Sequence, residues 1–392
     1  MNREVLTPAV QRFLLEKANA DPRKIALSKS PFEKVSSSDL ATQIESRQKA
    51  KKKLPLWFHS DSICYPPSIS IEQASSEPTA LYKSKLIPEN ETVIDLTGGF
   101  GVDTFYFSLR AKVVVHCEIN PELSSIAAHN TKQLGRNNIQ FINGNGIDYI
   151  INNEDSYNTI FIDPSRRVNT KKVFKLDDCE PNIIQNQDEL LKKSQQVIIK
   201  TSPLLDISLS ISQLKHVKEV HIISLKNECK ELLFILEKDF IGIPVIHAAL
   251  INDSKEYIFS FSETEEKKSS FQIEEPLQYL YDPDVAILKA GCFKLLAQRY
   301  MLKKLNLNTH LYTSNNKIES FPGRVFKVKE TLEYKEFKKT KENLSANVIA
   351  KNFPLNVENL RKKHKIEESE NDFIFFCKTS NDKLSVIIAE RV

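Results

Sequence analysis

The spacing of apolar residues divides the chain into three regions. Residues 1–85 carry apolar side chains mostly at helical spacing, with a break at "YPPS", and predict a helical region. Residues 86–263 alternate short, β-branched apolar runs with helical segments, which is typical of an α/β protein with a parallel sheet. Residues 271–392 combine one helical segment, "DVAILKAGCFKLLAQRYML", with the strand patterns "RVFKVKE", "FIFFCKT" and "LSVIIAE". They predict a small α+β appendage.

The middle region contains seven runs that predict the strands of one Rossmann-like sheet. In chain order they are Thr92–Leu96, "KVVVHC", "NIQFING", "NTIFIDPSRR", "QVIIKTSP", "EVHIISL" and "ELLFILEK". Two further runs, "PVIHAALI" and "YIFSFS", predict strands at the far edge of this sheet or on a hairpin. The stretch "SETEEKKSS" has no apolar residue and predicts a linker to the appendage.

One turn holds a third of the glycines in the chain. Gly98, Gly99 and Gly101, three of nine, fall between the first predicted strand and a predicted helix at Val102–Arg110. Glycine adopts backbone angles closed to other residues and lets a ligand approach the main chain. Such a turn at the carboxyl edge of a parallel sheet is where nucleotide-like ligands bind. A tight turn without a ligand is the alternative.

The spacing of these glycines excludes two common nucleotide motifs. It differs from the dinucleotide pattern G-x-G-x-x-G, and the Gly-Lys-Ser/Thr of a P-loop does not follow. Asp95 precedes the glycines instead, and no phosphate-binding lysine accompanies them. An acid in this place suits a ligand with a cationic amine, and S-adenosylmethionine (SAM) is the candidate.

Polar residues at the ends of the next three strands fit the same ligand. Glu118 ends the second strand, roughly 20 residues past the glycines, where an acid can accept hydrogen bonds from both ribose hydroxyls. Asn145 follows the third strand and could bond the adenine amino group, and Asp163-Pro164 ends the fourth. The order of these features along the chain is more specific than any one of them.

In this order of strands, glycine turn and polar strand ends, the chain resembles the class I SAM-dependent methyltransferases. "VIDLTGGFGVDT" is similar to their first motif, with Thr97 where the first glycine usually stands. Glu118 then matches the ribose-binding acid of that class, and Asp163 matches the acid of its fourth motif. The segments "IEQASSEPTALYK", "DPSRR", "IKTSPLLDI" and "KNECKELLF" narrow the resemblance to a bacterial family with a THUMP-like C-terminal domain, usually described as RNA methyltransferases.

The resemblance implies a domain organisation and a set of cofactor-binding residues. The expected domains are a helical region at 1–85, a methyltransferase domain at 86–263, a small ferredoxin-like subdomain at 271–318 and a THUMP-like domain at 319–392. The residues expected to bind SAM are Asp95, Gly98, Gly99, Gly101, Asp103, Thr104, Glu118, Asn145 and Gly146.

The fourth motif carries the candidate acceptor chemistry. Amine methyltransferases of this fold often have D/N-P-P-aromatic, in which the acid or amide holds the target amine and the aromatic ring stacks on the base. Here Ser165 and Arg166 replace the second proline and the aromatic residue, and a guanidinium can also stack on a base or grip a phosphate. A loop whose arginines pair with Asp177 and Asp178 is the alternative. The expected catalytic residues are Asp163, Pro164, Arg166 and Arg167.

Two further observations bear on this pocket. Cysteine is missing from the fourth motif and its sequence neighbours, so a pyrimidine-C5 mechanism, which needs a cysteine nucleophile, is not expected. Lys200 and Asp206 lie at the tip of the fifth predicted strand and are weaker candidates for the pocket.

The positive charge is concentrated near the C-terminus. Residues 321–365 contain twelve Lys and Arg against five Glu, with Phe326, Tyr334, Phe337 and Phe353 interleaved. This composition fits a phosphate-binding face, in which we expect Arg361, Lys362 and Lys363 to contact nucleic acid. A solvated surface on a lysine-rich protein is the alternative, and it applies equally to "RQKAKKK" from Arg47.

Composition changes this picture only a little. The net charge is +4, and the contents of 41% hydrophobic and 27% charged residues are ordinary for a globular protein. No apolar run has the length of a membrane span, and the first residues form an amphipathic helix rather than a signal peptide. The six cysteines are widely spaced without a C-x-x-C pair, which argues against a zinc site and suits a reducing cytoplasm. No metal is therefore expected.

The sequence as a whole predicts a cytoplasmic SAM-dependent methyltransferase that modifies a base nitrogen in structured RNA, such as tRNA or rRNA. Two alternatives stay open. The first is a methyltransferase acting on a small molecule or a protein, and the second is a non-catalytic RNA-binding protein that retains SAM as a structural ligand. The oligomeric state is not determined by the sequence.

Overall fold

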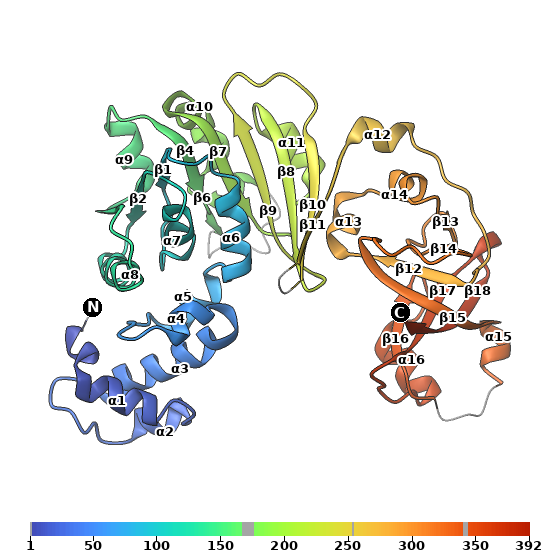
Figure 1. The fold of residues 1–392 in the computed structure, drawn as a ribbon, viewed down its shortest axis with the longest axis horizontal. Coiled ribbons are helices and arrows are strands. Elements are labelled where there is room, and N and C mark those ends of the chain that lie inside the picture. The colour runs from blue at the N-terminus through green and yellow to red at the C-terminus, as the bar shows by residue number, and fades with distance from the viewer. Residues whose placement is uncertain (1, 167–175, 253–254, 340–343) are drawn as a thin grey trace. The chain divides into compact units, whose positions relative to one another are not determined.

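The computed structural model describes residues 2–166, 176–252, 255–339 and 344–392 (Figure 1). The chain divides into two compact units, which are treated separately below. The N-terminal unit comprises Met1–Lys218 and Leu232–Gly242, and the C-terminal unit comprises Glu219–Glu231 and Ile243–Val392.

The first 85 residues are helical, as the sequence predicts. The elements are η1 (Arg3–Leu6), α1 (Pro8–Glu16), α2 (Pro22–Leu27), α3 (Ser37–Lys53), α4 (Pro55–His59), α5 (Ser68–Gln73) and α6 (Glu77–Lys85). Trp57 of α4 is fully buried and packs edge-on against Phe105, with ring centroids 4.9 Å apart. Phe105 belongs to α7 (Val102–Ser108), the helix that follows the glycine turn. One apolar core therefore joins the helical region to the helix that shapes the candidate site.

In the N-terminal unit, neighbouring strands follow the order β9-β7-β4-β1-β2-β3, and β9 belongs to this unit from Leu232 onward. Its strands are β1 (Thr92–Asp95), β2 (Val113–Glu118), β3 (Ile139–Asn143), β4 (Tyr157–Ile162), β7 (Ser194–Thr201) and β9 (Glu228–Glu237). All neighbouring pairs are parallel except β7 and β9. The connections run outward in opposite directions from β1 and β4, so the carboxyl ends of these two strands form the switch point at which ligands bind in such sheets.

The connections between these strands supply the rest of the N-terminal unit. The helices are α7, α8 (Pro121–Gln133), α9 (Gly146–Asn152), α10 (Ile183–Lys193) and α11 (Ile207–Gln213), with the short η2 (Leu176–Asp178). The two-residue strands β5 (Ser165–Arg166) and β6 (Cys179–Glu180) pair with each other in the antiparallel sense directly after β4.

The C-terminal unit contains the remaining strands. Strand β10 (Val245–Asn252) pairs parallel with β8 (Val217–Leu225) and antiparallel with β11 (Lys255–Ser262). A separate sheet has the order β13-β14-β12-β15-β18-β17-β16. Its strands are β12 (Tyr279–Pro283), β13 (Lys303–Lys304), β14 (Tyr312–Ser314), β15 (Gly323–Glu333), β16 (Asn347–Lys351), β17 (Asp372–Lys378) and β18 (Leu384–Arg391). Its helices are α12 (Glu263–Lys268), α13 (Val285–Ala290), α14 (Lys294–Arg299), α15 (Tyr334–Phe337), α16 (Val357–His364) and η3 (Ser380–Asp382).

Strand β17 explains why the sequence "FIFFCK" is apolar without alternation. Phe373 and Phe375 lie in one core of the C-terminal unit, whereas Ile374 and Phe376 lie in a second core. Successive side chains of a strand point to opposite faces of its sheet. A strand buried on both faces therefore needs a continuous apolar run.

Two local expectations are wrong. The stretch predicted as a linker contains α12, whose capping box pairs Ser262 with Glu265. The next residue, Glu266, accepts hydrogen bonds from the first N–H groups of α14, so polar capping rather than apolar burial orders this segment. The single helix predicted around residue 290 is broken into α13 and α14, because Gly291 has φ +73° and ends α13. A third expectation is confirmed: the runs predicted at the sheet edge or on a hairpin are β10 and β11, which pair with each other in the antiparallel sense.

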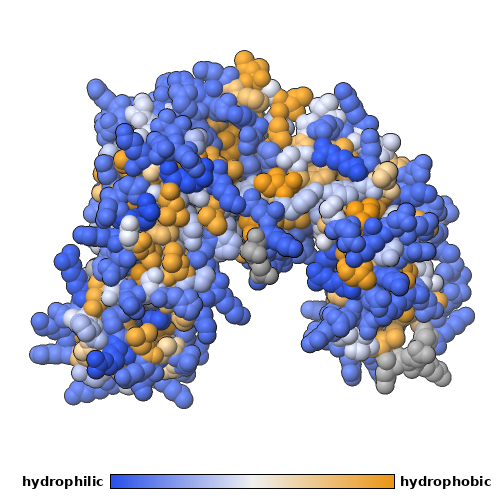
Figure 2. Space-filling model, in the orientation of Figure 1, coloured by the Kyte–Doolittle hydropathy of each residue, from blue (hydrophilic) through white to orange (hydrophobic). Residues whose placement is uncertain are grey.

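The visible face of the molecule is mostly hydrophilic, with hydrophobic residues in small groups (Figure 2). Within the ranges that the structure describes, no helix is both long and apolar enough to cross a membrane. All six cysteines are free thiols, and five of them are buried.

A buried ion pair fastens α6 to the helix after the glycine turn. The Lys83 side chain is fully buried, and its Nζ lies 3.1 Å from Oδ1 of Asp103 in α7. Ser75 joins the pair, since its hydroxyl donates to Asp103 Oδ2 at 2.7 Å and accepts from Lys83 Nζ at 2.7 Å. Breaking a buried pair by removing one partner leaves an uncompensated charge in the protein.

We therefore expect Lys83→Met to lower the free energy of unfolding by about 3–5 kcal/mol, because Asp103 keeps its charge and loses its cation. Urea unfolding followed by circular dichroism measures the change. Lys85→Met is the matched control, since Lys85 is exposed on the same helix, and it should stay within about 0.5 kcal/mol of the parent. Equal losses in both variants would contradict a role for the buried pair.

Candidate active site at the carboxyl edge of the sheet

The glycine turn between β1 and α7 has two residues in left-handed conformations. Gly99 has φ +55°, and Gly101, the N-cap of α7, has φ +81°. Residues with side chains rarely adopt these angles. A Cβ atom on Gly99 would meet only the carbonyl oxygen of Thr97, at 3.8 Å, among the described residues. The turn therefore presents bare main chain at Gly99.

Two of the other expected cofactor glycines have packing reasons of their own. A Cβ atom on Gly98 would lie 2.2 Å from Nε2 of His116, a fully buried residue of β2. Burial lowers the pKa of His116 to about 4, so this ring is neutral at pH 7. A Cβ atom on Gly146 would lie 2.3 Å from the carbonyl oxygen of Leu96. Both glycines are required for close packing beneath the turn.

Asp95 lies at the base of the turn. Its Oδ1 accepts a hydrogen bond from the Thr97 N–H at 3.1 Å, and its Oδ2 accepts one from the Thr104 hydroxyl at 2.7 Å. Both Asp95 and Thr104 are buried. Burial raises the pKa of Asp95 to about 7. In this structure these two expected cofactor residues hold the turn itself, and Asp103 is held by Lys83 as described above.

Glu118 at the end of β2 is joined to the turn directly. The Gly99 N–H donates to its Oε2 at 2.9 Å, and the Asn120 N–H donates to its Oε1 at 2.8 Å. Each carboxylate oxygen can accept more than one hydrogen bond. The acid is therefore fixed beside the glycine main chain while it retains the capacity to accept the hydroxyls of a ribose.

Asn145 lies after β3 and acts as the N-cap of α9. Its Oδ1 accepts hydrogen bonds from the N–H groups of Ile147 and Asp148, at 2.9 and 3.4 Å. The residue is exposed. The cap fixes the direction of its side chain at the carboxyl edge of the sheet.

Asp163 follows β4 and lies on the other side of the switch point. Its backbone N–H donates to the Thr97 hydroxyl at 2.7 Å, so the first and fourth motifs are tied together. Its Oδ2 forms an ion pair with Nζ of Lys200, at the end of β7. The Asp163 side chain is 35% exposed, whereas that of Lys200 is only 11% exposed. Lys200 thus contacts the expected catalytic acid, whereas Asp206 caps α11 by accepting from the Leu209 N–H.

The described part of the fourth motif ends at Arg166. Pro164 is buried directly after Asp163, and Arg166 has a backbone pairing with Cys179 in the β5–β6 ribbon. Arg167 lies outside the described residues. The pairing brings a cysteine beside the motif in space, although none neighbours the motif in the sequence. Cys179 is buried, however, with 6% of its surface exposed, so its thiol is not presented to a substrate.

The basic stretch of the C-terminal unit separates into paired and exposed cations. Arg361 Nη1 lies 2.5 Å from Glu368 Oε1, so this expected nucleic-acid contact is engaged within the chain. Lys362 and Lys363, the other two, are exposed. Lys363 and the exposed Lys338 both lie over the Tyr334 ring, with Nζ 5.6 and 5.3 Å from its centroid.

The aromatic residues of this stretch do not form a stacking surface. Phe326, Tyr334 and Phe337 are buried, and Phe353 packs on the core that contains the latter two. The expectation that they alternate with the cations on one binding face is therefore wrong for these three, because β15 and α15 turn their rings inward. What the stretch offers to a ligand is ammonium groups.

Sequence reasoning missed three residues that organise the site. The Thr97 hydroxyl, Ser75 and Lys83 each support a motif residue through a hydrogen bond or an ion pair. Signals for them existed, since Thr97 is the departure from the first motif, and Ser75 and Lys83 lie in "IEQASSEPTALYK". Their partners lie 20 or more residues away, so no local pattern could assign the contacts.

Comparison with known proteins identifies the C-terminal domains and a relative that covers the whole chain. A family model described as a ferredoxin-like domain matches residues 279–322, and one described as THUMP domain-like matches residues 323–391. A crystal structure of a "putative methyltransferase" from Porphyromonas gingivalis W83 is 30% identical, covers 100% of this chain and 98% of its own, and superposes with a TM-score of 0.89.

Two curated relatives point the same way. A Mycobacterium tuberculosis protein named as an uncharacterized SAM-dependent methyltransferase is 23% identical over 71% of this chain and 72% of its own length. A Mycoplasma mobile protein named as an uncharacterized RNA methyltransferase is 30% identical, but over only 24% of this chain and 26% of its own.

The fold and the site define a SAM-dependent methyltransferase of the class I type. Within that class, the chain belongs to the bacterial family with ferredoxin-like and THUMP-like C-terminal domains that includes the Porphyromonas gingivalis protein. The cofactor is SAM. The site fits it, because Gly99 exposes main chain that a side chain would cover and Glu118 is fixed beside it.

We expect Glu118→Ala to weaken SAM binding by about 1–3 kcal/mol, since charge-assisted hydrogen bonds to the ribose would be lost. Isothermal titration calorimetry measures the affinity, and Glu154→Ala, at an exposed acid in a loop of the same unit, serves as the control. An unchanged affinity in Glu118→Ala would remove the assignment of Glu118 to the ribose.

Proposed function

We propose that this methyltransferase modifies a base nitrogen in structured RNA, such as tRNA or rRNA. The observation that carries the proposal is the placement of Asp163-Pro164 at the switch point, tied to the glycine turn through Thr97 and paired with Lys200. This places a carboxylate next to the cofactor turn in an orientation set by two partners.

The residues of the chain have simple tasks in such a reaction. SAM, when bound, supplies a methyl group that its sulfonium makes electrophilic. Asp163 accepts a hydrogen bond from the target amine, through the carboxylate oxygen that Lys200 does not hold, and aims the nitrogen lone pair at the methyl group. Buried Pro164 fixes the main chain that carries this acid. Positioning of this kind is the main demand of an in-line displacement.

The C-terminal unit supports RNA as the substrate class. Its THUMP-like match covers residues 323–391, which include the exposed lysines Lys338, Lys362 and Lys363. Ammonium groups contact phosphates irrespective of sequence, so this surface suits the backbone of a folded RNA. The name of the Mycoplasma mobile relative agrees with this class.

Transfer of tritiated methyl groups from SAM tests the proposal. The purified full chain is incubated separately with total RNA, total protein and a metabolite extract. We expect label in RNA, at a nitrogen-methylated base after digestion. Label in protein or metabolites would instead support another methyltransferase, and SAM binding without transfer to any fraction would support the non-catalytic alternative.

We expect Asp163→Ala to lower methyl transfer by about 10²-fold or more, because the acceptor loses the group that orients it. SAM affinity, measured by calorimetry, should change much less. Asp155→Ala, at an exposed acid before β4, controls for loss of surface charge. Full turnover in Asp163→Ala would show that the fourth motif is only scaffolding.

A second prediction concerns the salt dependence of RNA binding. Replacing Lys338, Lys362 and Lys363 together by Ala should flatten the log–log slope of affinity against salt by about 2, at roughly 0.7 per phosphate contact. SAM affinity should not change, because Asp95, Glu118 and the glycine turn are untouched.

The matched control for this triple variant replaces Lys329, Lys335 and Lys351, which are paired with acids of the chain. The control removes the same net charge as the first triple variant. Its lysines are already paired within the chain, so if specific phosphate contacts set the slope, the control should leave the slope nearly unchanged. Equal slopes in the two triple variants and the parent would show that Lys338, Lys362 and Lys363 are solvated surface residues that do not contact RNA phosphates.

A further inference from the structure

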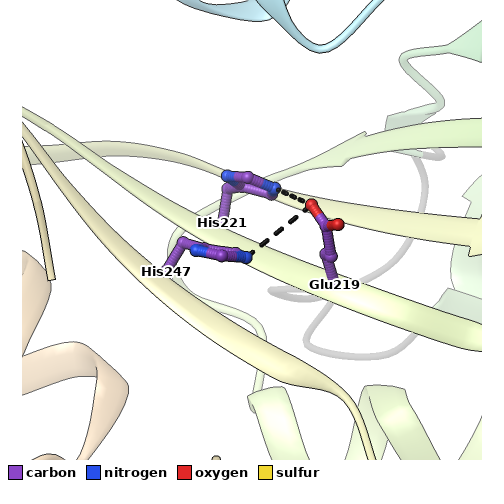
Figure 3. A group of neighbouring side chains, drawn as sticks. All are labelled: Glu219, His221 and His247. Carbon is purple, nitrogen blue, oxygen red and sulfur yellow. Dashed lines mark hydrogen bonds and ion pairs between the residues drawn. The ribbon is translucent and has the colours of Figure 1, made fainter. Parts of the chain in front are cut away.

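Three side chains of the C-terminal unit converge at a point that the methyltransferase site does not use (Figure 3). Glu219 and His221 come from β8, and His247 comes from β10. The one donor atom that each can offer lies within 4.8 Å of the other two.

The register of the two strands creates this group. His221 and His247 are direct partners in the parallel pairing of β8 with β10. Glu219 precedes His221 by two residues, so its side chain points to the same face of the sheet. Both strands are anchored by buried apolar residues on the opposite face, Val220 and Ile222 in β8 and Ile246 and Ala248 in β10. Backbone pairing therefore brings the three side chains together, and a hydrogen bond between His221 Nε2 and Glu219 Oε2, 3.0 Å apart, joins two of them.

Hydrogen bonding does not satisfy His247. Its Nδ1 lies 2.7 Å from the Ser260 hydroxyl, whereas its buried Nε2 has no hydrogen-bond partner among the described residues. That Nε2 lies 3.7 Å from Oε2 of Glu219, which is too long for a hydrogen bond. If Nδ1–H donates to Ser260, the lone pair of Nε2 faces a carboxylate, and a cation between them would relieve the repulsion.

We propose that Glu219, His221 and His247 bind a divalent transition metal ion, with Zn²⁺ as the best match. Two imidazoles and one carboxylate are a common zinc donor set, and hard ions such as Mg²⁺ prefer oxygen ligands. Zinc–ligand bonds of about 2.0–2.1 Å in a tetrahedron put neighbouring donors about 3.3 Å apart. The distances from Glu219 Oε2 to the two Nε2 atoms, 3.0 and 3.7 Å, bracket that value.

The surroundings agree with a metal site in three respects. The Ser260 hydroxyl is placed to orient His247 through the ring nitrogen that does not face the group, as partners of metal-bound histidines usually do. The His247 side chain is only 18% exposed, so its ring lies largely out of bulk solvent. Glu219 is 31% exposed, which gives an ion and its remaining water ligands access.

Binding has one geometric requirement. The two imidazoles are stacked, with centroids 4.5 Å apart and planes 20° from parallel. Both lone pairs reach a common point only if the rings fan apart about their Cβ–Cγ bonds. Such rotations are soft for side chains that end in planar rings. The bound ion would then cross-link β8 to β10.

The test uses the full chain without a histidine tag, freed of metal with a chelator. Calorimetry and thermal unfolding are recorded with Zn²⁺ and Mg²⁺, and the absorption spectrum with Co²⁺. We expect one Zn²⁺ per chain, a rise in Tm with Zn²⁺ but not with Mg²⁺, and the visible Co²⁺ bands of a nitrogen and oxygen site.

Variants locate the ion. His247→Gln and Glu219→Gln should each weaken Zn²⁺ binding by at least about 100-fold, and Ser260→Ala by about 10-fold, because it supports a ligand without being one. His59→Gln, at an exposed histidine of α4, should leave the affinity unchanged. Glu219→Gln keeps the test valid if His247→Gln disturbs folding, which circular dichroism would reveal.

Two results would overturn the proposal. One is the absence of Zn²⁺ binding by the parent protein below about 1 mM, the weak end of specific affinities. The other is equal Zn²⁺ affinity in the parent, His247→Gln and Glu219→Gln, with sulfur-to-Co²⁺ charge-transfer bands that place the ion on cysteines. Neither result bears on methyl transfer, which is measured separately.

Discussion

The glycine turn keeps its shape because the carboxyl group of Asp95 is buried beneath it and bonded to it. One oxygen of Asp95 accepts the Thr97 N–H and the other accepts the Thr104 hydroxyl. A buried carboxyl group without such partners would cost several kcal/mol, so the turn and the acid stabilise each other. The fixed turn in turn sets the Gly99 N–H against Glu118 and the Thr97 hydroxyl against Asp163. The cofactor side and the acceptor side of the site both depend on this one group.

Three acids end three strands of the sheet, and their surroundings give each a different task. Asp95 is closed off from solvent and meets only neutral donors, which suits a structural role. Glu118 accepts two main-chain N–H groups and retains capacity for further donors. Asp163 is partly exposed and paired with a lysine. The sequence marks all three as candidates because strand ends meet at one edge of a parallel sheet. Their environments, which only the fold supplies, distinguish the acid that supports the turn from the two acids proposed to bind the cofactor and to orient the substrate.

Most of the fold and part of the site could be predicted from the sequence. The rest could not, because it depends on contacts between distant segments rather than on neighbouring residues. Strands and the glycine turn are determined by adjacent residues, so β1 to β4 and the acids at the ends of β1, β2 and β4 were predicted in the right order. Helix α12 forms because polar groups cap it, but a segment of polar residues without apolar ones predicts a linker. The Lys83–Asp103 pair and the His221–His247 pair depend on contacts between segments 20 or more residues apart. Cysteine spacing gave no sign of the proposed metal site, since its donors are two histidines and a glutamate brought together by strand register.

The charge of the C-terminal unit shows why a count of basic residues overstates a binding surface. Five of the cations in the basic stretch are already paired with acids of the chain, Arg361 among them. Lys338 and Lys363 instead hold their ammonium groups over the Tyr334 ring in a cation–π arrangement, while both residues stay exposed. Because that ring is buried, it cannot stack on a base. A surface of this kind can recognise phosphates but not sequence. If RNA is the substrate, the choice of the modified base must therefore be made at Asp163 and its neighbours, while the lysines contribute affinity.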